Sequence, residues 1–291
     1  MAFSKGTEST EGVQIKRFIG VASVYVKGIN PTKEELEKFY DRTMESTPEY
    51  TGTADVNGEK VQQVRLDFLV QADPEKYEDF KSRVTFFLRN TPRVSNAGKM
   101  QIIDKYGRTA WATKEEIQAK QIPVYSNGKA ANIDASYRVA YTGEEELIKF
   151  LIAYLGIPSP QRYVNGEWIM NEPAKLADSE AMLEHIKDYF SGNVKELKDI
   201  IGYQPNNKVK VLFGIRTTDD GRQFQAPYTR NFLKNGVNDY SRLDKEVKEA
   251  KNNGAFPTTE FEVSELHEYV VAPTDFNSPE PAAPASTPWD F

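Results

Sequence analysis

The sequence has 291 residues, no cysteine and a formal net charge of −6 at pH 7. The lack of cysteine excludes disulfides, thiolate nucleophiles and zinc–thiolate sites. An apolar fraction of 39%, with 12% aromatic residues, is enough for a sizeable core and argues against global disorder. The negative charge does not by itself favour a nucleic-acid binder, because an evenly acidic surface repels phosphates.

The charge is unevenly distributed along the chain. Residues 83–112 contain six bases and one acid, and residues 207–235 contain six bases and two acids. Residues 32–60 are the reverse, with eight acids and four bases. Basic and acidic blocks therefore alternate, so the protein can have a local anion-binding surface despite its negative net charge. Each block alone also fits an ordinary solvated face.

Residues 1–14 are small and polar and are predicted to form a flexible N-terminus, without the apolar run of a signal peptide. The longest apolar run, residues 147–155, contains Lys149 and is too short to span a bilayer. We therefore expect a cytoplasmic protein that does not enter membranes. If it is phage-encoded, that compartment is the cytoplasm of the bacterial host.

The first elements show clear periodic patterns. Alternating apolar residues predict a strand over 17–29. Thr32 and Glu35 have the spacing of a capping box, which predicts a helix directly after Thr32.

The next segment predicts antiparallel strands. Asn57-Gly58 suits a tight hairpin turn, and alternation over 61–71 predicts the second arm, with Gln63, Arg65 and Asp67 facing outward. Residues 83–89 are predicted to form another strand. Residues 99–113 are predicted to form a hairpin around the turn 105–108.

Two further capping boxes start at Thr113 and Thr142, and the second predicts an apolar helix that ends near Leu155. Residues 156–177 contain three prolines and are predicted to be irregular. The remaining elements are predicted in this order: helices at 179–190 and 194–201, strands at 208–216 and 222–230, a helix at 239–251 and a short strand near Phe261.

These elements predict an α+β fold in one nucleic-acid-binding domain, residues 15–271. The composition changes at Ala272, after which five prolines and few aliphatic residues predict a disordered, extended tail over 272–291. The tail ends in Trp289-Asp290-Phe291, which we interpret as a recognition tip. The phenyl ring would fill an apolar pocket of a partner protein, and the Asp290 and terminal carboxylates would pair with a basic rim. The alternative is a chain end without a function.

Enzyme signals are weak in this sequence. There is no glycine-rich phosphate loop, and neither His185 nor His267 has a partner at a metal-ligand spacing. We therefore expect a protein that is not an enzyme and that has no cofactor and no metal ion.

Aromatic and basic residues are interleaved at two places. On strand 222–230 they share one face, and strand 208–216 adds cations to it. The second place is the turn 105–108 with the tryptophan beyond it. Stacking rings beside cations are what sequence-independent binding of single strands requires. The predicted single-stranded DNA-binding residues are Lys105, Tyr106, Arg108, Trp111, Lys208, Lys210, Arg216, Arg222, Phe224, Tyr228 and Arg230. The alternative is core aromatic residues flanked by ordinary surface charge.

The chain resembles single-stranded DNA-binding proteins of tailed bacteriophages, of the type found in crAss-like phages. The resemblance rests on residues 213–218 (FGIRTT), on residues 228–236 (YTRNFLKNG) and on the proline-rich tail with a terminal Phe. It implies an OB-like five-stranded antiparallel barrel elaborated by helices. It also implies that the tip, Trp289, Asp290 and Phe291, recruits replication proteins. The single Asp in this tip, in place of a run of acids, departs from the pattern.

The sequence therefore predicts a sequence-independent single-stranded DNA-binding protein of phage replication or recombination, which could form a homo-oligomer. One alternative is a structural or virion-associated interaction protein without nucleic-acid binding. Another is a nuclease that uses scattered carboxylates.

Overall fold

The computed structural model describes residues 17–77, 80–156, 161–165, 167–170, 188, 190–191, 205–217, 223–252, 259–260 and 262–269. Within this part of the chain, the main element is a nine-stranded antiparallel sheet. Its strands are β1 (Phe18–Ile29), β2 (Thr51–Val56), β3 (Glu59–Ala72), β4 (Lys81–Pro92), β8 (Tyr141–Thr142), β11 (Lys208–Thr217), β12 (Gln223–Lys234), β13 (Thr259–Glu260) and β14 (His267–Glu268). The strand order is β12-β11-β1-β3-β4-β8, with β2 on β3, β13 on β11 and β14 on β1.

Period-two alternation makes these segments strands with one buried face. In β1, Val24 and Val26 are fully buried, whereas Tyr25 between them is partly exposed. The same alternation runs through β3 and β4, so that their inner residues join one core. The predicted turn at Asn57-Gly58 is confirmed, with φ of 54° and 84°, as a tight hairpin requires.

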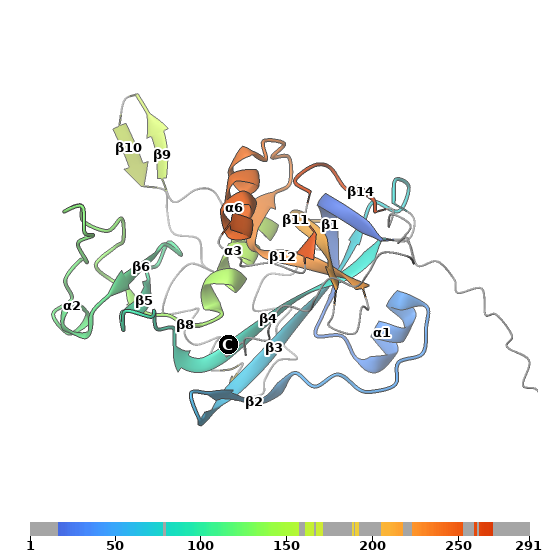
Figure 1. Ribbon diagram of the computed structural model, residues 1–291, viewed down its shortest axis with the longest axis horizontal. Helices are drawn as coiled ribbons and strands as arrows, with labels where there is room; N and C mark the ends of the chain where they lie inside the picture. Colours follow the sequence, from blue (N-terminus) through green and yellow to red (C-terminus); the bar gives the residue numbers. More distant parts are fainter. Residues whose placement is uncertain are drawn as a thin grey trace, which may run out of the picture.

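The sheet curls into a half-barrel (Figure 1). A cluster of aromatic rings belongs to the core inside it. The ring of Phe86 on β4 lies 5.8 Å from that of Phe232 on β12, centroid to centroid. Both rings also contact Phe150 of helix α3 (Glu144–Tyr154), at 5.3 and 5.0 Å. Since β4 and β12 lie far apart in the strand order, these contacts hold the curl together.

Two more helices lie outside the half-barrel. Helix α1 (Lys33–Tyr40) begins at Thr32, whose side chain accepts from the Glu35 amide while the Glu35 carboxylate accepts from the Thr32 amide, so the predicted capping box is confirmed. Helix α6 (Ser241–Asn252) packs Leu243 and Val247 against the outer face of the sheet. Among the described residues, no helix has both the length and the apolarity to cross a bilayer.

Residues 93–140 form a lobe beside the half-barrel, at the left of Figure 1. It contains β5 (Met100–Ile103), β6 (Thr109–Ala112), β7 (Arg138–Val139) and helix α2 (Lys114–Gln118), and its strand order is β6-β5-β7. The predicted 99–113 hairpin and the Thr113 capping box are both confirmed. A small core of its own, centred on Ile102 and Tyr137, stabilises the lobe.

Glu145 of α3 joins the lobe to the half-barrel. Its carboxylate accepts from Gln101 at 2.6 Å and from Arg93 at 3.0 Å, and Lys149 lies 2.8 Å away. Burial acts to raise the pKa of Glu145, but Lys149, Gln101 and Arg93 together lower it. The carboxylate therefore stays charged at neutral pH, and its bonds fix the lobe against the half-barrel.

Two predictions about local structure are wrong. Thr142 does not cap α3, because it lies in β8 and its hydroxyl donates to the Thr91 carbonyl; Gly143 is the N-cap residue, without a side-chain bond. Residues 161–164 and 167–170 are not irregular but form two paired antiparallel strands, β9 (Gln161–Val164) and β10 (Glu167–Met170). The prolines of this region flank these strands and leave their hydrogen bonds intact. The helix predicted at 194–201 and most of that at 179–190 lie outside the described residues.

Gly143 provides a sharp test of this packing. Its φ is 87°, and a Cβ at this position would lie far inside van der Waals contact of the Phe87 carbonyl oxygen. Gly143→Ala is expected to destabilise the fold by about 3 kcal/mol or more, measured by urea unfolding, since β4 or α3 must move. Gly128→Ala is the control: φ is 77° but nothing lies within 4 Å, so only the left-handed strain of about 1 kcal/mol applies. Equal losses in the two variants would contradict the close approach of β4 to α3.

Candidate functional site

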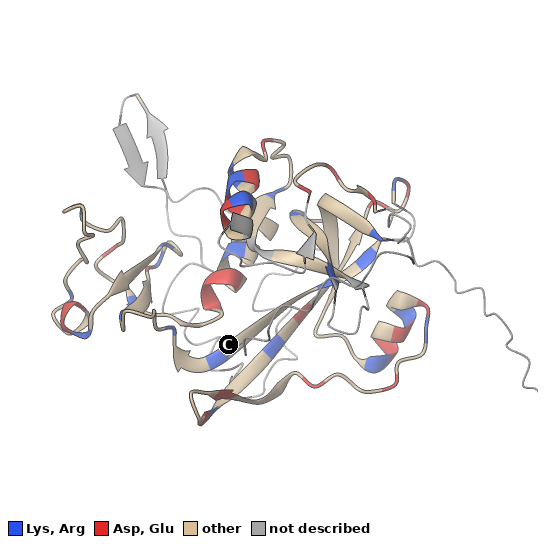
Figure 2. Ribbon diagram, viewed as in Figure 1, with Lys and Arg blue, Asp and Glu red and all other residues tan. Residues whose placement is uncertain are grey.

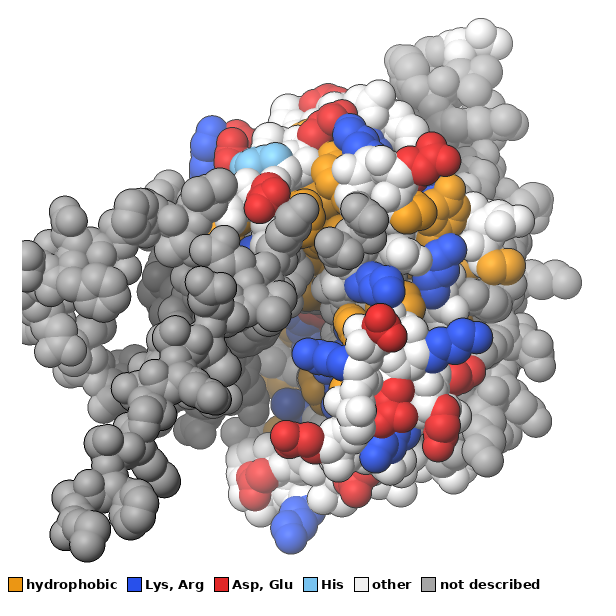
Figure 3. All heavy atoms as spheres, turned by 90° about the vertical axis from the view of Figure 1, so that its right-hand side faces the viewer, with side chains coloured by type: hydrophobic (Ala, Val, Ile, Leu, Met, Phe, Trp, Pro, Cys, Tyr) orange, Lys and Arg blue, Asp and Glu red, His pale blue; other side chains and the backbone are white. Residues whose placement is uncertain are grey.

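A groove of about 660 Å³ lies on the outer face of β3 and β4, where β12 approaches β4. Among the described residues that line it, five are cations and none is a carboxylate; the cations are Arg42, Arg65, Lys81, Arg83 and Arg216. Figure 3 views the side of the molecule that carries α1, where Lys and Arg side chains are interspersed with hydrophobic ones and with Asp and Glu. Figure 2 shows basic residues on β3 and β4. The groove is therefore a basic surface on a protein whose net charge is −6.

A buried carboxylate below the groove positions two of these cations. Asp67 is fully buried and lies 2.9 Å from two nitrogens of Arg65, its Nε and Nη2, and 3.2 Å from Nη1 of Arg83. The Thr85 hydroxyl donates to the same carboxylate at 2.7 Å. The Asp67 main chain is fixed by two hydrogen bonds with Asn30, both of 2.8 Å.

This arrangement leaves the cluster with a net positive charge. Two guanidinium groups share one carboxylate, and their side chains are 27% and 37% exposed. A guanidinium has five N–H donors in a planar fork, so edges remain for an anion in the groove. Asp67 therefore orients the arginines without neutralising both.

Aromatic side chains border the cations. The Phe87 ring is 47% exposed on β4, and Tyr40 of α1 lines the same groove. Phe87 and Arg65 also line a second hollow of about 500 Å³, formed with residues 46–52 and Gln63. In that hollow, the hydroxyl of Tyr50 donates to the Pro31 carbonyl at 2.6 Å, and burial raises its pKa. The two hollows thus meet at an exposed ring between cations, a surface on which a planar group could stack.

Of the residues predicted on β11 and β12, Arg216 lies in this groove and is exposed, whereas Lys210 and Tyr228 point elsewhere. Lys210 is only 8% exposed, and its ammonium donates to Asn238 at 2.8 Å and to the Tyr240 hydroxyl at 3.0 Å. Tyr228 is 2% exposed and packs with Leu212 under α6. The prediction that these two side chains face solvent is wrong, because α6 covers Tyr228, whereas Asn238 and Tyr240, in the segment before α6, bind Lys210.

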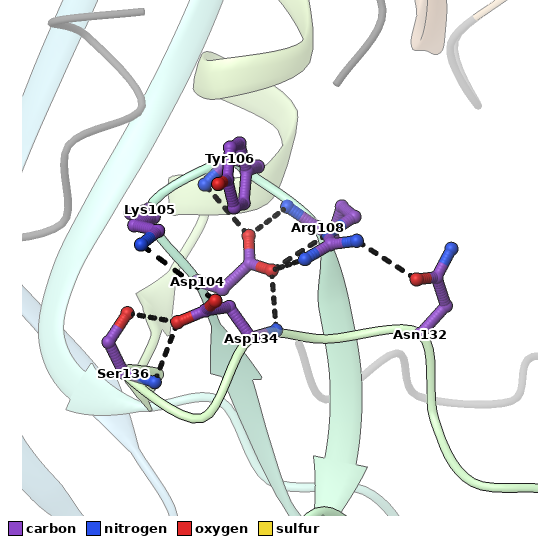
Figure 4. A network of polar contacts seen from close by, with 7 residues as sticks. All are labelled: Asp104, Lys105, Tyr106, Arg108, Asn132, Asp134 and Ser136. Atoms are coloured by element: carbon purple, nitrogen blue, oxygen red, sulfur yellow. Dashed lines mark hydrogen bonds and ion pairs between the residues drawn. The ribbon is translucent and has the colours of Figure 1, made fainter. Parts of the chain in front are cut away.

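The predicted turn residues Lys105, Tyr106, Arg108 and Trp111 lie together in the lobe, apart from the groove. Figure 4 shows the turn held by Asp104, which accepts from the amides of Tyr106 and Arg108 and from the Arg108 side chain at 2.7 to 3.0 Å. The Arg108 side chain is 15% exposed and also donates to Asn132 at 2.9 Å. Lys105 lies 3.8 Å from Asp134. These cations mainly stabilise the turn.

The other predicted residues have different positions. Lys208 lies on β11 with its ammonium 4.4 Å above the Tyr25 ring, and the Trp111 ring lies 5.9 Å from the Arg93 guanidinium. The side chains of Phe224 and Arg230 lie outside the described part of the structure. Arg222 and the tip residues Trp289, Asp290 and Phe291 also lie outside it.

The sequence pattern of β4 also indicates part of the groove. On β4 the outward positions are Arg83, Thr85, Phe87 and Arg89, which is the same alternation of cations and rings that singled out strand 222–230. Arg65 was predicted to face outward, and it does. No periodic pattern predicts that Tyr40 and Arg42 lie in the groove, because they reach it from the end of α1.

Among the described residues, no group of three or more His, Asp or Glu side chains could hold a metal ion. No protein-family model, curated protein or solved structure matches this chain.

The arginine cluster predicts a graded loss of stability. Asp67→Ala is expected to lower the free energy of unfolding by about 3 kcal/mol, because two partly buried guanidinium groups lose their common partner. Thr85→Val is expected to cost about 1 kcal/mol, since one hydrogen bond is lost while both arginines keep theirs. Urea denaturation of the two variants measures the difference. If Asp67→Ala cost no more than Thr85→Val, the carboxylate would not organise the cluster.

Proposed function

We propose that this protein binds single-stranded DNA through the groove on β3 and β4, without sequence preference, in phage replication or recombination. The observation that carries the proposal is the half-exposed Phe87 ring among five cations, with no carboxylate among the described residues of the groove lining. Phosphates would meet the cations and bases would stack on the ring. Every nucleotide has a phosphate and a base that can stack, so binding would not depend on the DNA sequence.

The strand order supports an OB-like barrel as the finer description of the fold. In chain order the five long strands are β1, β3, β4, β11 and β12. Across the sheet their order is β12, β11, β1, β3 and β4, so that the fifth strand of the chain comes first and is followed by the fourth, first, second and third. Helix α3 falls between the third and the fourth and packs inside the curl. OB-folds bind oligonucleotides on their second and third strands and on the loops joining strands one to two and four to five.

The groove residues map onto the same parts of the chain. Arg65 and Phe87 belong to the second and third strands, and Arg42 lies in the connection between the first and second. Arg216 and Gln225 flank the connection between the fourth and fifth strands. In an OB-like barrel these parts of the chain would form the binding surface, so their position around one groove supports the proposal.

The tail completes the proposed function. A proline-rich segment that ends in Trp289-Asp290-Phe291 would recruit replication proteins while the groove holds DNA. This role rests on the sequence and on the resemblance to phage single-stranded DNA-binding proteins. The same resemblance makes a bacterial cytoplasm the proposed location.

The test is a fluorescence-anisotropy titration of labelled (dT)20, with a duplex as the comparison, at several salt concentrations. Phe87→Ala is expected to weaken (dT)20 binding by about tenfold, within the 1–3 kcal/mol of a stacked base. Arg216→Ala is expected to make the slope of log K against log salt shallower by about 0.7, the value of one phosphate contact.

Matched controls separate the groove from general surface effects. Tyr125→Ala removes a ring that is 45% exposed but lies in the lobe, and Arg242→Ala removes an exposed cation on α6. Both variants should bind (dT)20 like the unchanged protein. Failure of the folded, unchanged protein to bind (dT)20 at low salt would overturn the proposal and favour a structural or interaction protein.

A further inference from the structure

A second pairing of cations with a ring lies outside the groove, on β1 and β11. The Tyr25 ring has the ammonium of Lys208 at 4.4 Å from its centroid and that of Lys27 at 4.7 Å. Within the described part of the chain, neither ammonium forms an ion pair with a carboxylate. An anion could therefore bind between them without displacing a protein partner.

The strand register connects this pair with the groove. Lys208 lies opposite Tyr25, Tyr25 opposite Gln71, and Gln71 opposite Lys81. Residues directly opposite in antiparallel strands point to the same face of the sheet. All four are partly exposed, whereas their strand neighbours Val24, Val70 and Val209 are buried in the core. The four side chains thus form one row on the outer face, which we call the Tyr25 row.

Lys81 belongs both to the Tyr25 row and to the groove lining. Neighbouring strands lie about 4.8 Å apart, so the row extends roughly 14 Å from Lys81 across β3 and β1 to Lys208. The row and the groove therefore meet at Lys81. Together they carry the rings of Phe87 and Tyr25 and several cations.

We propose that the Tyr25 row is a second contact segment for the same DNA strand, an inference that rests on the proposed function of the groove. A strand that leaves the groove at Lys81 would cross β3 and β1. Lys27 and Lys208 would then bind its phosphates, and Tyr25 would stack on a base. A short oligonucleotide would occupy the groove alone, and only a longer one would reach Tyr25.

The test compares (dT)6 with (dT)20 by anisotropy over a range of salt concentrations, using the full chain. The variant is Lys27→Ala with Lys208→Ala, and its control is Lys245→Ala with Lys248→Ala, two exposed lysines on α6. The double variant should bind (dT)20 about tenfold more weakly at low salt, with a salt slope shallower by about 1.4, the value of two phosphate contacts. Binding of (dT)6 should change less than twofold, and the control should match the unchanged protein.

Tyr25→Leu tests the ring separately, because leucine keeps the packing of an apolar side chain. It should weaken (dT)20 binding several-fold without changing the salt slope. Unchanged (dT)20 affinity and slope in the lysine variant would overturn the second segment. An equal loss of affinity for both oligonucleotides would also overturn it. That result would mean that the lysines lie in the groove or act only through long-range electrostatic attraction. If the unchanged protein bound neither oligonucleotide, the proposed function itself would fail.

Discussion

The contact of Phe86, Phe150 and Phe232 is the interaction on which the rest of the structure depends. It joins β4 near one edge of the sheet, helix α3 and β12 at the other edge, and so curls an open antiparallel sheet into a half-barrel. Rings of this size bury large apolar areas, and their tilted and edge-on packing fixes the geometry more narrowly than aliphatic contacts would. Without the curl, β12 would not approach β4, and the groove that lies between them on the outer face would not exist.

A second level of organisation lies directly above this core. Asp67 stands at an outward position of β3 and is nevertheless fully buried, because Arg65, Arg83 and Thr85 close over it. The carboxylate stabilises the cluster, and the cluster in turn presents guanidinium edges to the groove. The proposed binding surface is thus preformed, which lowers the entropy cost of ordering long cationic side chains when a ligand binds. The Tyr25 row continues this surface across the curved sheet and would lengthen the path of a bound strand.

The protein also shows how an acidic chain can hold a basic site. Acidic residues concentrate between positions 32 and 60, while the groove draws its cations from several separate segments. Because salt screens charges beyond about 10 Å at 0.1 M, the local excess of arginine matters more for a phosphate in the groove than the net charge of the molecule. The lobe uses its cations differently, since Arg108 and Lys105 are tied to Asp104 and Asp134.

The sequence by itself determined the long strands, the turn at Asn57-Gly58, two of the three predicted helix caps and the outward position of Arg65. Each of these follows from local periodicity or from a bond between residues a few positions apart. The tertiary structure alone decided which outward faces stay exposed. Tyr228 and Lys210 alternate as surface residues do, yet α6 covers Tyr228, and Asn238 and Tyr240 bind Lys210. Phe87 and Arg216 line one groove only because contacts between rings far apart in the sequence curl the sheet. Period-two alternation assigns a side chain to one of two faces, but it carries no information about what later packs on that face, and this is why the groove required the structure.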